Sequence, residues 1–99
     1  MNLRILASAF KDLADGRDFY ERQGAGVGEY FLDSLFSDID SLALYAGIHR
    51  KVFGFHRLLS KRFPYAVYYQ FDGRNAIVYR VLDCRQNPRK TSTALKSGG

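Results

Sequence analysis

The sequence has few of the residues that hold together a small secreted domain or a metal centre. Its 99 residues contain one cysteine, Cys84, and no tryptophan. A single cysteine forms no internal disulfide, and Cys84 has no partner at metal-ligand spacing. His49 and His56, the two histidines, are seven residues apart and complete no metal pattern. We therefore expect a reduced, cytoplasmic protein that uses no metal and no cofactor.

Long apolar runs are also missing. No stretch approaches the ~18 apolar residues of a membrane-spanning helix, and the N-terminus lacks the apolar core of a signal peptide. The hydrophobic share of 46%, with seven tyrosines and eight phenylalanines, is nevertheless enough for one core. We expect a single domain over residues 1–90, no membrane partner, and a flexible basic C-terminal tail over residues 91–99.

Carboxylates are absent from the middle of the chain, between Asp40 and Asp72. Residues 1–40 carry a net charge of −4 and residues 41–99 a net charge of +9. Such asymmetry has two explanations. Either the C-terminal part meets a negatively charged partner, or the acidic N-terminal part balances it within the protein.

Residues 55–85 contain three segments in which apolar and polar residues alternate. Turn chemistry separates the segments, first at Phe63-Pro64 and then at residues 72–75. This pattern predicts a three-stranded antiparallel meander. The apolar residues 2–7 predict an N-terminal strand that pairs with the later sheet.

The apolar spacing between these strands is helical. Ser8 is the expected N-cap of a first helix that ends at Gly24, and a second helix is expected from Val27 to Tyr45. The short glycine-containing link predicts an antiparallel hairpin, and residues 46–54 are interpreted as a loop. The fold class is therefore α+β, with the helices on one face of one sheet. The expected apolar face of the first helix consists of Phe10, Leu13, Ala14, Arg17 and Tyr20, opposite a solvated face of Asp12, Asp15, Asp18 and Glu21.

The register of the last hairpin follows from its aromatic residues. Pairing Tyr69 with Tyr79 gathers the large apolar side chains on one face. It leaves a three-residue loop in which Asn75 takes the left-handed conformation, although Gly73 suits that conformation better. The opposite face stays open and carries cations that can bind phosphate or carboxylate, and Tyr68 there could stack on a base. The candidate binding residues are Arg57, Lys61, Arg62, Tyr68, Arg80 and Arg85.

Three segments resemble the RelE/ParE superfamily, the toxins of bacterial type II toxin–antitoxin modules of the plasmid stabilisation type. They are DFYERQGAGVGEYF, HRLLSKRFPYAVYYQF and VYRVLDCRQNP, and the resemblance covers about residues 3–90. It implies an N-terminal strand, a helical hairpin and an antiparallel sheet with an open concave face.

The resemblance also implies one of two activities. RelE-like members cut mRNA on the ribosome with cations on the open face, and Arg57 and Arg85 match two of these positions. Leu59 and Ala66, however, stand where RelE-like enzymes have lysine and arginine, and no tyrosine follows Tyr79. ParE-like members lack the catalytic set and act by binding DNA gyrase. The chain therefore resembles the ParE-like branch more, which implies a gyrase inhibitor without catalytic residues.

The implied partner is a cognate antitoxin whose acidic residues meet the basic face. Two alternatives stay open. One is a metal-independent, ribosome-dependent endoribonuclease that uses Arg57, Lys61, Arg80 and Arg85, with Lys61 in place of the missing lysine. The other is a non-toxic relative that only binds its antitoxin. A homodimer and a toxin–antitoxin hetero-oligomer are both compatible with the sequence.

Overall fold

Five strands form one mixed sheet in the computed structural model, which describes residues 1–96. The strands are β1 (Asn2–Ile5), β2 (Lys51–Val52), β3 (Phe55–Leu59), β4 (Tyr65–Phe71) and β5 (Asn75–Asp83). Their order is β1-β5-β4-β3-β2, with β1 parallel to β5 and every other pair antiparallel. The α+β class is confirmed. The sheet is mixed where the resemblance implied an antiparallel one, and the order of elements contains α3, β2 and α4 in addition to those predicted.

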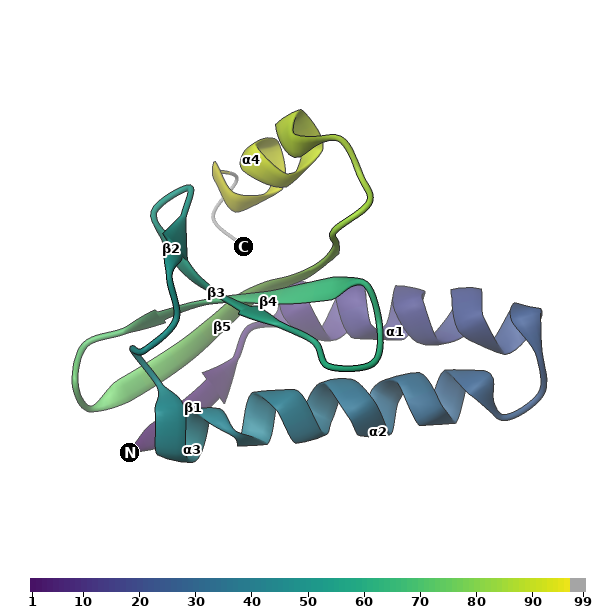
Figure 1. Cartoon of the computed structure of the whole chain (residues 1–99), viewed down its shortest axis with the longest axis horizontal. Coiled ribbons are helices and arrows are strands. Elements are labelled where there is room, and N and C mark those ends of the chain that lie inside the picture. The colour runs from purple at the N-terminus through teal and green to yellow at the C-terminus, as the bar shows by residue number, and fades with distance from the viewer. Residues whose placement is uncertain (97–99) are drawn as a thin grey trace.

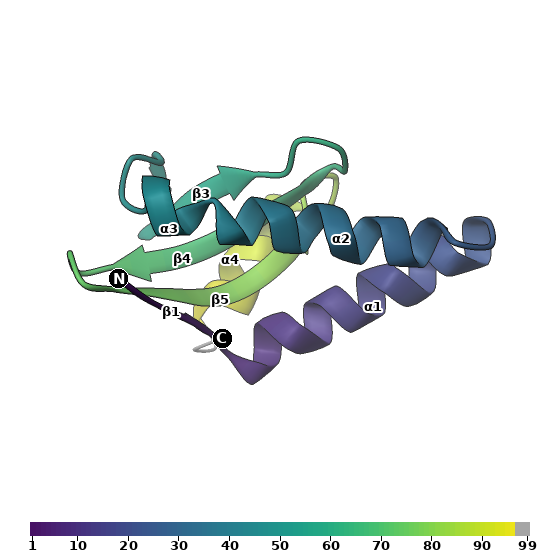
Figure 2. The same ribbon diagram turned by 90° about the horizontal axis from the view of Figure 1, so that it is seen from below.

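Two long helices cover one face of this sheet. Helices α1 (Ala7–Gln23) and α2 (Val27–Asp40) lie side by side as an antiparallel hairpin (Figure 2). Helix α2 has an apolar stripe at helical spacing, whose members are fully buried against the sheet. They are Phe31, Leu35, Ile39 and Leu42, the last lying at the start of α3 (Leu42–Tyr45). No helix in the described part of the chain is long and apolar enough to cross a membrane.

The first helix differs from its prediction in two ways. It begins at Ala7 after the N-cap residue Leu6, and the Ser8 hydroxyl inside its first turn donates to the Tyr79 carbonyl at 2.8 Å. The predicted Ser8 cap is therefore wrong. The buried face includes Gly16, while Phe10 is 50% exposed. A side chain at Gly16 would start only 2.5 Å from Cζ of Phe31, so the close approach of α2 sets which side of α1 faces inward.

The second helix ends earlier than predicted, at Asp40. The Ser41 hydroxyl donates to the Asp38 carbonyl at 2.6 Å, a local bond that competes with helical hydrogen bonding. The short helix α3 follows. The predicted loop 46–54 contains strand β2, which returns to β3 through Phe53 and Gly54. Both turn residues have positive φ, of 55° and 83°, as in a type I′ hairpin turn.

The predicted register of the β4–β5 hairpin is correct over only part of its length. Tyr68 pairs with Arg80 as expected, but a bulge then shifts Tyr69 from Tyr79 to Val78. The extra residue in β5 reverses the faces beyond it. Val78 is therefore buried in the main core, while the Tyr79 ring packs edge-on against Phe55 at 5.1 Å.

The turn of this hairpin is also different from its prediction. Gly73 has a φ of 96°, and Asn75 is the first residue of β5. The Asp72 carboxylate accepts the backbone N–H groups of Arg74 and Asn75 at 2.8 and 2.7 Å. This side-chain turn positions the loop without a left-handed asparagine.

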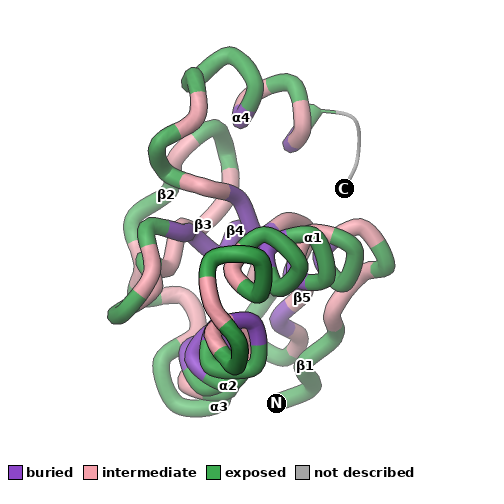
Figure 3. Tube along the Cα trace, turned by 90° about the vertical axis from the view of Figure 1, so that its right-hand side faces the viewer, coloured by how far each residue is buried: buried purple, intermediate pink, exposed green. Residues whose placement is uncertain are grey.

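The other face of the sheet is covered by α4 (Pro88–Lys96), so the prediction of an open face is wrong (Figure 1). A second core lies there and consists of Ala66, Tyr68, Leu82 and Leu95. Figure 3 shows buried positions both in the sheet and on α4. Residues 91–96 of the predicted flexible tail belong to this helix, and residues 97–99 lie outside the described residues. The Asn87 side chain accepts the Arg89 N–H at 2.8 Å and Pro88 opens the helix, which explains why a helix starts here.

Candidate binding surface

Three predicted site residues form a row across the sheet. Arg57 of β3 lies opposite Tyr68 of β4, which lies opposite Arg80 of β5. Tyr68 is only 4% exposed and contributes to the core under α4, so it presents no surface for stacking a base. Burial raises the pKa of its phenol, and the charge of Arg57 and a hydrogen bond from it act in the opposite direction. Arg57 is thus held beside a buried hydroxyl while remaining partly exposed.

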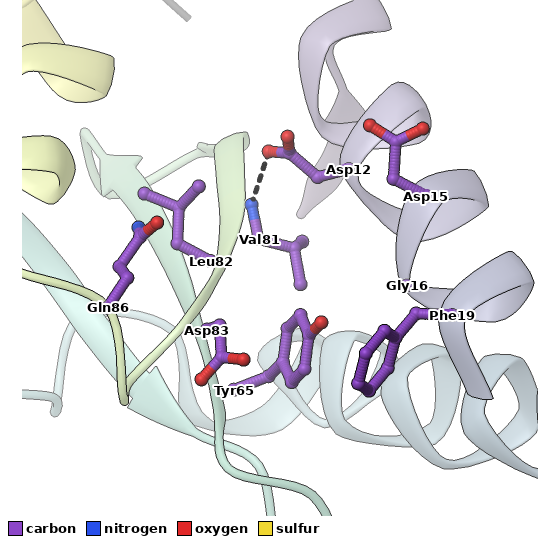
Figure 4. A pocket seen from close by; sticks show the side chains of 9 residues that line it. All are labelled: Asp12, Asp15, Gly16, Phe19, Tyr65, Val81, Leu82, Asp83 and Gln86. Atoms are coloured by element: carbon purple, nitrogen blue, oxygen red, sulfur yellow. Dashed lines mark hydrogen bonds between the residues drawn. The ribbon is translucent and has the colours of Figure 1, made fainter. Parts of the chain in front are cut away.

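Arg80 is engaged by the fold itself. Its Nε and Nη2 atoms donate to the two carboxylate oxygens of Asp12 at 2.7 and 2.8 Å, and Nη1 donates to the Ala94 carbonyl at 3.4 Å. The same carboxylate accepts the Val81 N–H at 2.9 Å (Figure 4). The bond with Asp12 raises the pKa of Arg80. Arg80 therefore joins α1, β5 and α4, and Asp12 does not belong to the solvated face predicted for it.

Arg85 follows β5 and is paired locally. Its guanidinium donates to both carboxylate oxygens of Asp83, at 3.0 and 2.8 Å, and these bonds lower the pKa of that carboxyl. Partial burial raises the pKa of the Cys84 thiol, and the positive charges of Arg57 and Arg85 oppose the rise. The two residues that match RelE-like positions, Arg57 and Arg85, thus both act electrostatically on this thiol.

The two remaining candidates lie in the loop between β3 and β4. The Arg62 guanidinium carbon is 5.9 Å from the ring centroid of Tyr30, a residue of α2. Arg62 therefore leans toward the helical layer, away from the face that was predicted for it. Lys61 is exposed and makes no ion pair among the described residues.

A cavity of about 230 Å³ opens between α1 and β5 (Figure 4). Burial raises the pKa of Tyr65, which lines it, to about 12, so that phenol is neutral at pH 7. Each lining carboxylate is already paired with a cation, which leaves the cavity without a free charge. These pairs are Asp12 with Arg80, Asp15 with Lys11 and Asp83 with Arg85. In the described part of the chain, no three potential metal ligands lie together.

Comparison with known proteins decides the family. A model described as "ParE toxin of type II toxin-antitoxin system, parDE" matches residues 3–88, most of the chain. The chain belongs to the ParE toxin family. A solved structure titled "Chromosomal ParDE TA system from P. aeruginosa" is similar in fold, with a TM-score of 0.72. It shares 20% identity, and the match covers 82% of this chain and 92% of that one. No curated protein matches the sequence significantly.

One feature of this ParE-family chain was not predicted from its sequence. Tyr69 is fully buried, and its hydroxyl accepts the Gly47 N–H at 3.0 Å and contacts Nδ1 of His49. His56 donates from its own Nδ1 to the His49 carbonyl at 2.6 Å. Burial lowers the pKa of His49, and the charge of His56 adds to that shift. The network ties the segment after α3 to β4. A tyrosine at a core-facing strand position is its sequence signal, because a buried hydroxyl needs a partner.

Proposed function

We propose that this ParE-family chain is the toxin of a type II toxin–antitoxin module and that it inhibits DNA gyrase by binding it. The family implies a cognate antitoxin as the neutralising partner. Binding is favoured over catalysis because two arginines on the α4 face of the sheet are already paired with carboxylates of this chain. Arg80 is bound bidentately by Asp12, and Arg85 by Asp83.

A metal-independent ribonuclease needs a base for the ribose hydroxyl, charge at the scissile phosphate and an acid for the leaving oxygen. Leu59 and Ala66 supply neither charge nor a proton. Tyr68 is buried beneath α4 and its phenol has a raised pKa, which makes it a poor base. Arg57 and Lys61 remain accessible, and two cations without a proton acceptor favour binding. The alternative of a ribosome-dependent endoribonuclease is therefore the weaker one.

Supercoiling by purified gyrase tests the proposal directly. We expect the chain to inhibit supercoiling and to increase the fraction of cleaved DNA, and a bound antitoxin to restore activity. Full gyrase activity at a large excess of toxin would contradict the proposal. New cuts in translated mRNA after induction, mapped by primer extension, would replace it with the ribonuclease alternative. Unimpaired growth after induction would instead indicate a non-toxic relative.

Arg57 is the residue to change first. It is partly exposed, lies on rigid β3 and makes no ion pair among the described residues. We expect Arg57→Ala to reduce toxicity or antitoxin affinity more than Arg17→Ala, which removes an exposed arginine of α1 paired with Asp18. Growth inhibition and antitoxin titration measure the two effects. Equal losses for both variants would exclude a role for the β3 cation.

A further inference from the structure

The charges of this protein are distributed unevenly along its chain. The helical layer, residues 7–40, contains eight carboxylates and three basic residues. Residues 41–71 contain five basic residues and no carboxylate, and residues 84–96 contain four basic residues and no carboxylate. Because α4 lies across the sheet from α1 and α2 (Figure 1), no ion pair among the described residues joins a carboxylate of the helical layer to a cation of α4.

The outer side of α4 is the most uniform part of this basic region. Thr91 and Leu95 face the sheet and are buried. The exposed positions of the helix include Arg89, Lys90 and Lys96, and none of these three makes an ion pair among the described residues. No large apolar side chain lies between them. We call Arg89, Lys90 and Lys96 the α4 cations.

The hairpin of β2 and β3 extends this surface. A hollow of about 260 Å³ lies between hairpin and helix and is lined by Phe53, Phe55, Ser92, Leu95 and Lys96. Phe53 stands at the rim with a φ of 55° and is 49% exposed. Arg57 of β3 lies opposite Tyr68, on the face that α4 covers, and adds a partly exposed cation on that side. The basic surface therefore continues from the helix onto the hairpin.

The chemistry of the surface limits the kinds of partner that it can bind. An acidic amphipathic peptide needs several apolar anchor sites along its length, and this surface offers a single one, the hollow at Phe53 beside the helix. Single-stranded nucleic acid needs a series of exposed rings for stacking, and Phe53 is a single ring at the margin. A run of phosphates needs only positive charge in a regular array. From Arg89 to Lys96 the helix rises by about 10 Å, which spans roughly three phosphates of one DNA strand.

We propose that the α4 cations bind the phosphate backbone of duplex DNA without reading its sequence. This binding surface is additional to the gyrase interaction, and it does not depend on gyrase being the target. A fluorescein-labelled duplex of about 20 base pairs and arbitrary sequence is the probe, followed by fluorescence anisotropy with the full chain. With three phosphate contacts, the affinity should fall about 40-fold between roughly 50 and 200 mM salt.

The matched variants are two triple substitutions with the same change in net charge. We expect Arg89→Gln/Lys90→Gln/Lys96→Gln to weaken binding at least about tenfold and to reduce the salt slope by about 2 to 3. Arg4→Gln/Arg22→Gln/Arg74→Gln removes three exposed cations from β1, α1 and the β4–β5 turn. That control should weaken binding less than about threefold. Arg89→Lys/Lys90→Arg/Lys96→Arg should bind as the unchanged chain does, and equal urea midpoints verify that the variants are folded.

Several results would overturn the proposal. The first is no binding of the duplex at about 50 mM salt with ~100 μM protein. The second is an equal loss of duplex affinity in the two variants that carry three glutamine substitutions each. Tighter binding of a poly-glutamate peptide than of the duplex would make the surface an acidic-peptide site. A preference of more than about tenfold for duplex RNA would make it an RNA site. Because the assay contains no gyrase, failure here and failure of the supercoiling test are independent.

Discussion

At the scale of single residues, Asp12 joins more elements than any other carboxylate described above. It lies on α1, accepts two bonds from Arg80 and a third from the Val81 N–H, and is 10% exposed at its side chain. Asp12→Ala leaves a largely buried guanidinium without its charge partner. We expect a loss of about 2 kcal/mol in the free energy of unfolding, below the full cost of a buried pair because Arg80 is 21% exposed. Urea denaturation measures it.

Asp15→Ala is the matched control on the same helix. Its pair with Lys11 has side chains that are 76% and 63% exposed, so the change should stay within about 0.5 kcal/mol. Asp12→Asn keeps an acceptor for Val81 and should cost less than Asp12→Ala. Equal destabilisation by Asp12→Ala and Asp15→Ala would contradict the role of Asp12 as a joint between α1 and β5.

His49 makes the stability depend on pH. Burial lowers the pKa of the folded His49 below its unfolded value of about 6.5, so the unfolded chain binds more protons as the pH falls. Its contribution to stability is therefore present above the unfolded pKa and is lost as the pH falls toward the folded pKa. We expect a lower urea midpoint at about pH 5 than at about pH 7.5.

His49→Asn isolates this effect, because asparagine can accept a bond from Tyr69 near the position of Nδ1 but does not titrate. The difference in urea midpoint between the two pH values should shrink in this variant. An unchanged difference would mean that His49 is not the titrating group. Asp72 and Asp83 do not interfere, since their pKa values are lowered further below this range by hydrogen bonds.

At the scale of elements, α4 is attached by few apolar side chains. Leu95 is 3% exposed and packs with Ala66, Tyr68 and Leu82, so Leu95→Asp places a charge in the second core. We expect a loss of about 2 to 4 kcal/mol in the free energy of unfolding. Hydrogen exchange should become fast in residues 88–96 while β4 stays protected. Lys90→Ala, at an exposed position of the same helix, should leave exchange unchanged. Fast exchange in β4 as well would mean that α4 does not open as a separate unit.

The predictability of these elements follows from how local their signals are. The α2 stripe and the alternation of β4 are visible within a few residues, and both appear in the structure. The bulge beside Tyr79 has no local signal, because one inserted residue leaves apolar residues on both faces. Helix α4 carries only Leu95 and Thr91 inward, too few to show a period, although Asn87-Pro88 is a helix-start signal that the prediction missed.

The predicted site shows the same division between local and distant information. The row from Arg57 through Tyr68 to Arg80 was predictable from strand alternation. The pairing of Arg80 with Asp12 was not predictable, because Asp12 lies 68 residues away in the sequence and has the spacing of a solvated helix position. Strand alternation therefore indicates the face of Arg57 and Arg80, but not that of Arg62 in the β3–β4 loop, and it gives no sign that Arg80 is already paired within the fold.

At the scale of the whole molecule, carboxylates are concentrated in the helical layer, and the cations of α4 lie on the other side of the sheet. The helical layer has an excess of carboxylates, and residues 84–96 contain cations without a carboxylate. Charges in one layer repel over short distances, while attraction between layers acts over longer ones. Added salt weakens both, with a Debye length of about 10 Å at 0.1 M. The partly buried Asp12–Arg80 pair is screened less than these surface charges.

Moderate salt should therefore stabilise this protein. We expect the free energy of unfolding to rise by about 0.5 to 1 kcal/mol between roughly 20 and 300 mM NaCl, as repulsion within each layer is screened. Neutralising the α4 cations by Arg89→Gln/Lys90→Gln/Lys96→Gln removes part of that repulsion. The variant should therefore show a smaller increase in the free energy of unfolding over the same salt range. Thermal and urea unfolding in the same NaCl series measure both. A decrease of stability with salt would show that attraction between the acidic and basic layers outweighs repulsion within them, and the two sides of the sheet would then act as one electrostatic unit.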